Sequence, residues 1–138
     1  MPFPSLTIRT NIWLETEDGE VALSRWRIEL LEAVDREGSI SAAAKALGIQ
    51  YRLAWQRIRE MEERLGFALV ETTVGGRGGG GAQLTPEARA LVDELKAMFA
   101  VIDNCAQEQS AKYLHRLRRA LEEAEDRLSP ARADESSG

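Results

Sequence analysis

The 138-residue chain has very little of the chemistry that most enzymes and metal-binding proteins use. Cys105 is its only cysteine and His115 its only histidine, which excludes an internal disulfide and a His/Cys metal cluster. Its apolar runs are only a few residues long, so no segment is expected to span a membrane, and Met1–Ser5 has no features of a secretory signal. We therefore expect a cytoplasmic protein with no metal, no cofactor and no membrane partner.

Two remaining features are poor candidates for catalysis or nucleotide binding. The acidic residues Glu122, Glu123, Glu125 and Asp126 fit an exposed helix face better than paired catalytic carboxylates. The glycine-rich stretch Gly75–Gly81 lacks the Gly-Lys-Ser or Gly-Lys-Thr ending of a nucleotide-binding loop, and it leads into a strand rather than a helix. We therefore predict that the protein is not an enzyme.

The net charge of −5 hides an uneven distribution. Residues 1–44 hold four arginines against eight acidic residues, whereas residues 45–77 hold six lysines and arginines against four acidic residues. Binding to DNA needs a locally basic surface rather than a basic protein. The acidic total is therefore compatible with a nucleic-acid partner, although a central excess of two positive charges is weak support by itself.

The first part of the chain predicts a small β element followed by a helix. Leu6–Leu14 alternates apolar and polar residues, which is typical of a half-buried strand. Asp18-Gly19 is a turn signal, and a short returning strand is predicted at Val21–Leu23. A helix is then predicted over Ser24–Glu37, with Ser24 as its N-cap and Gly38 as its end.

The next stretch has the pattern of two short helices joined by a tight turn. Ser39 or Ser41 can cap an alanine-rich helix over Ala42–Leu47, Gly48-Ile49 makes the turn, and a second helix is predicted over Gln50–Leu65. Small side chains on the first helix let the two helices approach closely. The pattern predicts a helix-turn-helix, a motif that places its second helix in the major groove of DNA.

The second helix has two distinct faces. Its apolar side is predicted to face the core through residues at four-three-four spacing: Ala54, Ile58, Met61 and Leu65. The residues roughly opposite this stripe, at about 100° per residue, are polar or charged: Arg52, Gln56, Arg59 and Glu63. Arg can bind guanine and Gln can bind adenine in a bidentate manner, and either can bind phosphate. We therefore predict DNA contacts from five residues on this helix: Gln50, Tyr51, Arg52, Gln56 and Arg59. Trp55 is expected to pack to the side, against the first or the last helix.

A hairpin with a glycine-rich tip follows, with strands predicted over Ala68–Thr72 and Ala82–Leu84. Six of the seven residues from Gly75 to Gly81 are glycine, which permits positive φ and a close approach of the backbone to phosphate. Arg77 adds a positive charge suited to phosphate or to a narrow minor groove. We therefore predict a DNA-contacting wing over residues 73–81 that includes Gly76 and Arg77; the alternative is a hairpin tip with no role.

Thr85-Pro86 predicts the start of a long helix that Ser129-Pro130 ends. Apolar residues recur at three-four spacing in a first run, Ala88, Leu91, Leu95, Met98, Ile102 and Cys105, and after a polar break at Gln107–Ser110 in a second run, Leu114, Leu117, Leu121, Ala124 and Leu128. Such spacing is typical of a coiled-coil-like helix. We predict that residues 86–128 dimerise with a second copy and that residues 129–138 form a disordered tail.

Three stretches resemble the amino-terminal domain of the ModE family of molybdate-responsive regulators: Gly38–Leu47, Tyr51–Trp55 and Gly75–Thr85. A more distant resemblance is to the LysR-type regulators. The resemblance implies a winged helix that dimerises through its last helix and binds a palindromic operator. By position, it places Gln50, Tyr51, Arg52 and Gln56 at the start of the recognition helix and Arg77 in the wing, although Gln50 stands where a small capping residue is expected.

ModE proteins bind molybdate through separate carboxy-terminal β-domains. No such domain follows the long helix in this sequence, so neither molybdate nor another oxyanion is expected as an effector.

We therefore predict a mainly helical α+β fold: a flexible start (residues 1–5), a winged helix-turn-helix domain with an N-terminal strand or hairpin (residues 6–85), and the dimerisation helix. The predicted function is that of a bacterial transcriptional regulator that binds a specific double-stranded DNA operator as a homodimer. The alternative is an interaction protein that uses the same helix to dimerise with another regulator and does not bind DNA independently.

Overall fold

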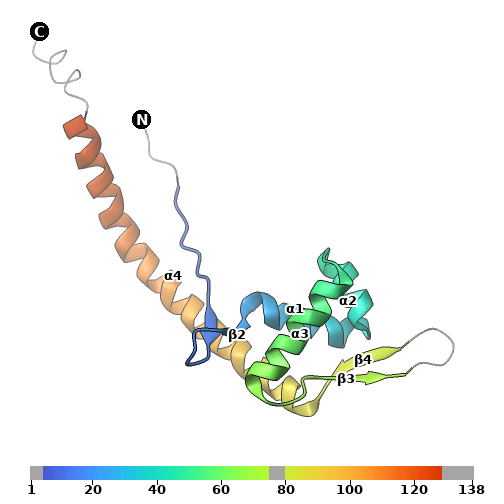
Figure 1. Ribbon diagram of the computed structural model, residues 1–138. Coiled ribbons are helices and arrows are strands. Elements are labelled where there is room, and N and C mark those ends of the chain that lie inside the picture. The colour runs from blue at the N-terminus through green and yellow to red at the C-terminus, as the bar shows by residue number, and fades with distance from the viewer. Residues whose placement is uncertain (1–4, 75–79, 129–138) are drawn as a thin grey trace, which may run out of the picture. The chain divides into compact units, whose positions relative to one another are not determined.

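A computed structural model describes residues 5–74 and 80–128 of the chain. In chain order its elements are β1 (Trp13–Glu15), β2 (Val21–Ser24), α1 (Arg25–Glu37), α2 (Ile40–Leu47), α3 (Tyr51–Leu65), β3 (Val70–Thr73), β4 (Gly81–Leu84) and α4 (Pro86–Leu128) (Figure 1). Within the described ranges no helix is long and apolar enough to cross a membrane. The predicted tail, and most of the predicted flexible start, lie outside the described residues.

The helix boundaries follow from capping residues that the sequence makes visible. Ser24, Ser39 and Thr85 each accept a hydrogen bond from the backbone N–H three residues ahead, at 3.0–3.1 Å. Of the two candidate caps, Ser39 rather than Ser41 is therefore the N-cap of α2. Gly38, Gly48 and Gly66 close α1, α2 and α3 in the left-handed conformation, which glycine adopts without steric cost.

The N-terminal strand is shorter than predicted. Only Trp13–Glu15 pairs with β2, in an antiparallel hairpin whose turn contains Gly19 at a φ of 84°. Residues 5–12 have no regular secondary structure, because in the described chain no strand pairs with them. The prediction of a strand over Leu6–Leu14 was therefore wrong for most of its length, whereas the hairpin itself is confirmed.

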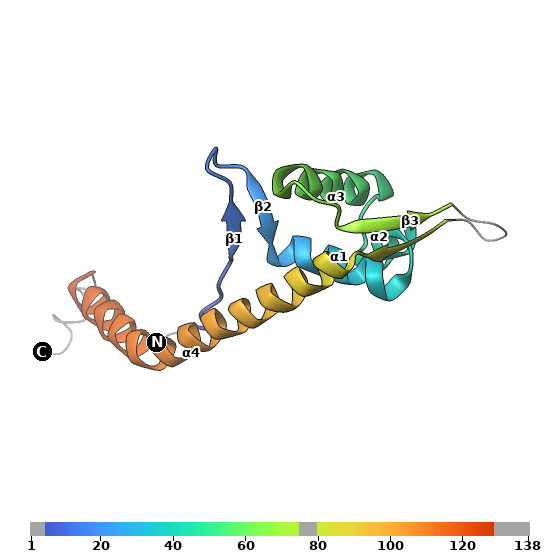
Figure 2. The same ribbon diagram turned by 90° about the horizontal axis from the view of Figure 1, so that it is seen from below.

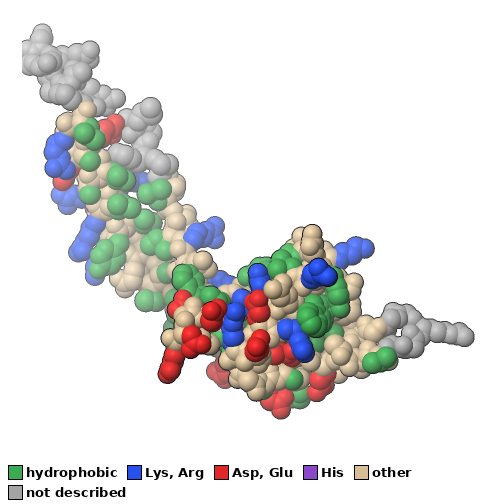
Figure 3. All heavy atoms as spheres, in the orientation of Figure 1, with side chains coloured by type: hydrophobic (Ala, Val, Ile, Leu, Met, Phe, Trp, Pro, Cys, Tyr) green, Lys and Arg blue, Asp and Glu red, His purple; other side chains and the backbone are tan. Residues whose placement is uncertain are grey.

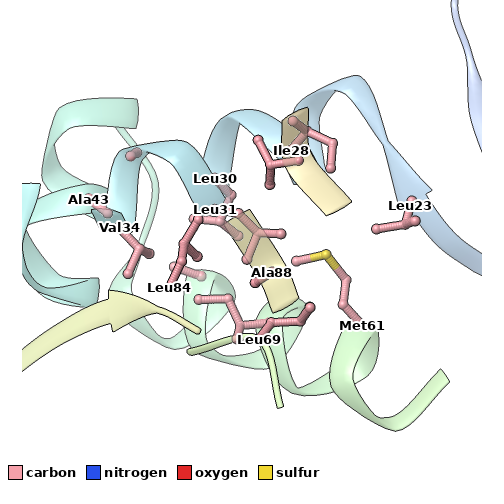
Figure 4. Close-up of a cluster of buried hydrophobic side chains, with 14 of the residues drawn as sticks. Leu23, Ile28, Leu30, Leu31, Val34, Ala43, Met61, Leu69, Leu84 and Ala88 are labelled. Atoms are coloured by element: carbon pink, nitrogen blue, oxygen red, sulfur yellow. The ribbon is translucent and has the colours of Figure 1, made fainter. Parts of the chain in front are cut away.

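The chain divides into two compact units, and the first to consider comprises residues 11–99. Its core gathers side chains from α1, α2, α3, both wing strands and the first turns of α4, and the largest of its fully buried side chains are Leu30, Leu31, Val34, Met61 and Leu69. Figure 4 shows these side chains meeting between the helices. The predicted core side of α3 is confirmed for Ala54, Ile58 and Met61, whereas Leu65 is half-buried.

The first turns of α4 belong to this core, which corrects the predicted dimer seam. The buried residues there are Ala88, Val92, Leu95 and Phe99, so Leu95 packs inside its own domain instead of facing a partner. At about 100° per residue, the predicted first run centred on Leu95 and the second run centred on Leu121 point in directions about 90° apart. The two runs therefore do not form one continuous seam.

The second unit comprises residues 1–10 and 100–138, of which residues 5–10 and 100–128 are described. The Thr10 hydroxyl donates a hydrogen bond to Asp103 at 2.7 Å, and Gln107 donates a long one to the carbonyl of Ile8 at 3.5 Å. Ser110 is 9% exposed. The polar interval at Gln107–Ser110 is therefore not an interruption of the helix, since α4 continues through it beside the N-terminal segment (Figure 2).

Candidate DNA-binding surface

Close packing of α2 against α3 sets the helix-turn-helix geometry. Ala43, Ala44 and Ala54 are at most 2% exposed, which leaves little space between the two helices. Gly48 at a φ of 67° makes the turn, and the Ile49 N–H donates to the Ala44 carbonyl at 3.0 Å. Small side chains and one left-handed glycine thus produce the tight turn that the sequence predicts.

The five α3 residues predicted to contact DNA share an exposed surface. We call Gln50, Tyr51, Arg52, Gln56 and Arg59 the outer face of α3, and every one of them is exposed. Within the described part of the chain, the side chains of Arg52 and Gln56 have neither a hydrogen-bond nor an ion-pair partner. Their donors and acceptors are therefore available to a ligand. Gln50 gives no side-chain cap to α3, which is consistent with its unusual identity at that position.

Trp55 lies at the edge of this face and is 46% exposed. Trp55 is therefore only partly covered, and its packing against the first or the last helix stays a prediction. The Arg59 guanidinium carbon lies 5.2 Å from the centre of the Trp55 ring, within the range of a cation–π interaction. Trp55 thus restricts the orientation of Arg59 on the surface.

The opposite flank of α3 uses its arginines to hold the domain together. Glu60 lies 3.2 Å from Arg27 of α1, 2.8 Å from Arg57 and 3.7 Å from Arg64. Arg64 also pairs with Glu20 at 3.2 Å and donates to the carbonyl of Val21 at 2.6 Å. Burial lowers the pKa of Arg27 below its usual value, and Glu60 opposes that effect.

Of the basic residues counted over 45–77, those that the structure describes divide into two groups. Arg57 and Arg64 are engaged in ion pairs, whereas Lys45, Arg52 and Arg59 remain exposed. Figure 3 shows Lys and Arg side chains over the region of α2 and α3, and Asp and Glu side chains gathered near the β1–β2 hairpin. Acidic residues of the N-terminal third of the chain thus gather away from the exposed basic residues of α2 and α3. One of them, Glu20, forms an ion pair with Arg64.

The base of the wing is fixed to the C-terminal end of α1 by hydrogen bonds. The Ala82 N–H donates to the Gly38 carbonyl at 2.8 Å, and the Leu84 N–H donates to Asp35 at 3.2 Å. Asp35 also accepts from Arg89 at 3.0 and 3.3 Å, and this contact lowers the pKa of the Asp35 carboxyl. Strands β3 and β4 pair from Val70↔Leu84 to Thr73↔Gly81. The predicted contact residues Gly76 and Arg77 lie outside the described residues.

A hollow of about 730 Å³ separates α2, the start of α3 and the base of the wing. Most of the polar groups that line it are hydroxyls, and one is an ammonium group: Ser39, Ser41, Lys45, Tyr51, Thr72 and Thr73. Hydroxyl and ammonium donors suit a phosphate group. Sequence reasoning did not group Ser41, Lys45 and Thr72 with the predicted contact residues, because they come from separate elements and become neighbours only in three dimensions.

Two helices joined by a tight turn, an exposed second helix and a β-hairpin define the class of winged helix-turn-helix DNA-binding domains. Residues 26–89 match the family model described as "Bacterial regulatory helix-turn-helix protein, lysR family". That description is of a bacterial regulator, which agrees with the prediction that the chain is not an enzyme.

The predicted resemblance to ModE proteins is also confirmed. The chain is 46% identical over 85 residues to the molybdenum transport protein ModE of Azotobacter vinelandii, covering 62% of this chain and 31% of that protein. It is 47% identical over 66 residues to the DNA-binding transcriptional dual regulator ModE of Escherichia coli (strain K12), covering 48% of this chain and 25% of that protein. The chain thus matches less than a third of the length of each relative.

Solved structures show the same fold at lower identity. The DNA-binding domain of CbnR in complex with DNA superposes with a TM-score of 0.51 at 21% identity, over 63% of this chain and 94% of that chain. VV2_1132, a LysR family transcriptional regulator, gives a TM-score of 0.50 at 20% identity over 64% of this chain and 28% of that chain. These likenesses confirm the mainly helical fold with a wing hairpin and a long C-terminal helix.

Proposed function

We propose that the chain is a sequence-specific transcriptional regulator that binds a palindromic operator as a homodimer. The outer face of α3 enters the major groove, and the wing contacts the backbone or the minor groove. One observation carries the proposal: the arginines of α3 with ion-pair partners lie on the core flank, whereas Arg52 and Gln56 carry unused donors on the exposed side. Bidentate Arg and Gln side chains are the usual means of reading guanine and adenine.

Phosphate contacts supply most of the non-specific affinity in this proposal. Lys45, Ser41 and Tyr51 line the hollow beside the wing and offer donors to one DNA backbone. Arg59, stacked on Trp55 nearer the middle of α3, offers a further positive charge. Arg77 in the glycine loop is proposed to contact the backbone or a narrow minor groove.

The proposal is tested by selecting bound sites from a random duplex library and then measuring variants on the selected site. Arg52→Ala and Gln56→Ala should each lose about 1–3 kcal/mol of binding free energy and relax the preference at one base position. Arg59→Ala and Arg77→Ala should weaken all duplexes alike and reduce the salt slope by about one unit. Glu63→Ala, an exposed acidic control on the same helix, should not weaken binding.

A second candidate is an interaction protein that dimerises with another regulator and has no independent affinity for DNA. The exposed leucines at the distal end of α4 favour it, because they suit a helical partner. The affinity of the wild-type chain for random duplex at low and raised salt separates the two. A DNA-binding protein loses affinity steeply as salt rises, whereas a purely partner-binding protein has almost none at either salt.

A further inference from the structure

An exposed indole ring lies among the polar residues of the outer face of α3. Trp55 comes three residues after Arg52 and four before Arg59, and it is 46% exposed. At about 100° per residue, its direction from the helix axis falls between those of Tyr51 and Arg59. Figure 3 shows hydrophobic side chains between Lys and Arg side chains over the region of α2 and α3. Trp55 therefore lies within the arc of side chains that we propose to contact DNA.

Trp55 is also central to this arc along the helix axis. Tyr51 and Arg59 are eight residues apart, which is about 12 Å at 1.5 Å per residue, and Trp55 is halfway between them. The next turn carries Glu63, an exposed acidic residue whose charge opposes the approach of phosphate. The part of α3 that can enter a groove of DNA is thus centred on Trp55.

The three tryptophans of the chain are held in different ways. Trp26 packs against the domain core, and the exposed Trp13 of β1 donates its ring N–H to Glu15 at 2.7 Å. The guanidinium of Arg59 lies over one face of the Trp55 ring. This contact limits the orientations of the ring, so that less conformational freedom is lost when the ring meets a ligand.

A hollow of about 700 Å³ lies between α3 and the wing strand β3, beside the Trp55 ring. Trp55, Ile58 and Arg59 line it from α3, and Val70 and Thr72 line it from β3. The wing strand therefore leaves space next to the ring, and the edge of a base can come within van der Waals distance of it.

The major groove presents one apolar group to a protein, the C5 methyl of thymine. Arg52 and Gln56 suit the hydrogen-bonding edges of guanine and adenine, whereas an indole ring suits the methyl group. We infer that Trp55 reads a thymine of the operator through its C5 methyl, at a base pair next to those that Arg52 or Gln56 contacts. The inference rests on the sequence-specific regulator of the proposed function and adds thymine to the site that it recognises.

Deoxyuridine tests the inference, because it lacks the methyl group but keeps every hydrogen-bonding group of thymine. Each thymine of the site selected from the random library is replaced in turn, and the affinity of the full-length chain is measured. One thymine per half-site should give a loss of about three- to fivefold, as expected for one buried methyl group. At that same position, 5-methylcytosine should bind more tightly than cytosine by a similar factor.

Variants of Trp55 show which residue contacts the methyl group. Trp55→Ala should bind the thymine and deoxyuridine duplexes equally, and Trp55→Phe, with a smaller ring, should keep a ratio of about two. The ratio of the two affinities is the decisive quantity, because an effect on folding or on Arg59 changes both affinities alike. Trp13→Ala removes an equally large ring, 49% exposed, from the β1–β2 hairpin and should keep the wild-type affinity and ratio.

The inference and the proposed function fail in different ways. A wild-type ratio of one at every thymine, or a selected site without thymine, overturns the inference and leaves the regulator. If Trp55→Ala loses affinity but keeps the wild-type ratio, the ring packs on the DNA backbone instead and the inference is wrong. If Trp55→Ala keeps both affinity and ratio, the ring lies on a surface for a protein partner, which also overturns it. A library that yields no preferred site refutes the regulator and the inference together.

Discussion

The two flanks of α3 carry the same residue type and use it in opposite ways. On the core flank, Arg57 and Arg64 are held by Glu60, which also receives Arg27 from α1. On the outer face, Arg52 has no such partner within the described residues, and Arg59 lies over the ring of Trp55. An arginine on a recognition helix is therefore not a DNA contact by virtue of its identity. The acidic neighbours that fold beside it decide whether its charge is already used.

The two ends of α4 show the same division for apolar residues. Leu95 lies in the first turns and is 6% exposed within the domain core, whereas Leu117 is 45% exposed. Both belong to runs with three-four spacing, and the sequence does not distinguish them. The difference is that the first turns meet α1 and the wing strands, while the distal turns do not belong to that unit.

The largest expected difference is between two variants that each place one charge on α4, the first near its start and the second in its distal part. Leu95→Glu should destabilise the domain by at least about 4 kcal/mol, because it buries an unpaired carboxylate in the core. Leu117→Glu should change the unfolding free energy by less than about 0.5 kcal/mol and act only on self-association. Urea denaturation monitored by circular dichroism, together with sedimentation, measures both. Equal destabilisation by the two variants would remove the distinction between the two ends of the helix.

An intermediate effect is expected for two acidic residues of α3 that differ in exposure, Glu60 being half-buried and Glu63 exposed. Glu60→Ala leaves the largely buried Arg27 without its ion-pair partner and should cost about 2–3 kcal/mol of stability. Glu63→Ala, its exposed counterpart, should leave stability within about 0.5 kcal/mol of wild type. Thermal unfolding of both variants at pH 7 is the measurement. If Glu60→Ala melts like wild type, the arginine cluster does not contribute to holding α3 in place.

The smallest expected effect concerns the anchor of the wing and depends on pH. Arg89 holds the pKa of Asp35 below its usual value of 3.8. The ionised Asp35 therefore contributes to stability above its usual pKa, and this contribution is lost as the pH falls through the lower pKa of Asp35 in the folded state. Because this ion pair is partly exposed, we expect the loss to be below about 1 kcal/mol.

Asp35→Asn keeps an acceptor for the Leu84 N–H but removes the charge. It should lower stability at pH 7 and reduce the decline between about pH 5 and pH 3 relative to wild type. Glu29→Gln, an exposed control on α1, should keep the wild-type pH profile. Denaturant midpoints across this pH range measure the effect, and an unchanged profile in Asp35→Asn would show that the Arg89 contact is not what the carboxylate contributes.

Local signals account for most of what sequence reasoning predicted correctly. Ser24, Ser39, Thr85, Gly38 and Gly66 mark helix ends because capping depends on residues within one turn of each end. The spacing of Ala54, Ile58 and Met61 identified the buried side of α3 for a similar reason, since a helix fixes the directions of its own side chains. The outer face followed as the complement of that stripe.

Errors arose wherever the outcome depended on a distant part of the chain. The strand over Leu6–Leu14 needed a partner strand along its whole length, and β2 pairs with only Trp13–Glu15. The polar break at Gln107–Ser110 gave no sign of the contact that the fold makes there, in which Gln107 donates to the carbonyl of Ile8.

The sequence by itself determined the helices, their caps, the tight turn at Gly48 and the apolar stripes, because each depends on residues a few positions apart. Only the tertiary structure decided which arginines of α3 are neutralised by Glu60 and Glu20, and which leucines of α4 are covered. They depend on contacts between residues that lie far apart in the chain, such as the hydrogen bonds of Arg27 with Glu60 and of Thr10 with Asp103. Periodicity specifies which way a side chain points from its own helix, but not what the rest of the fold places in front of it.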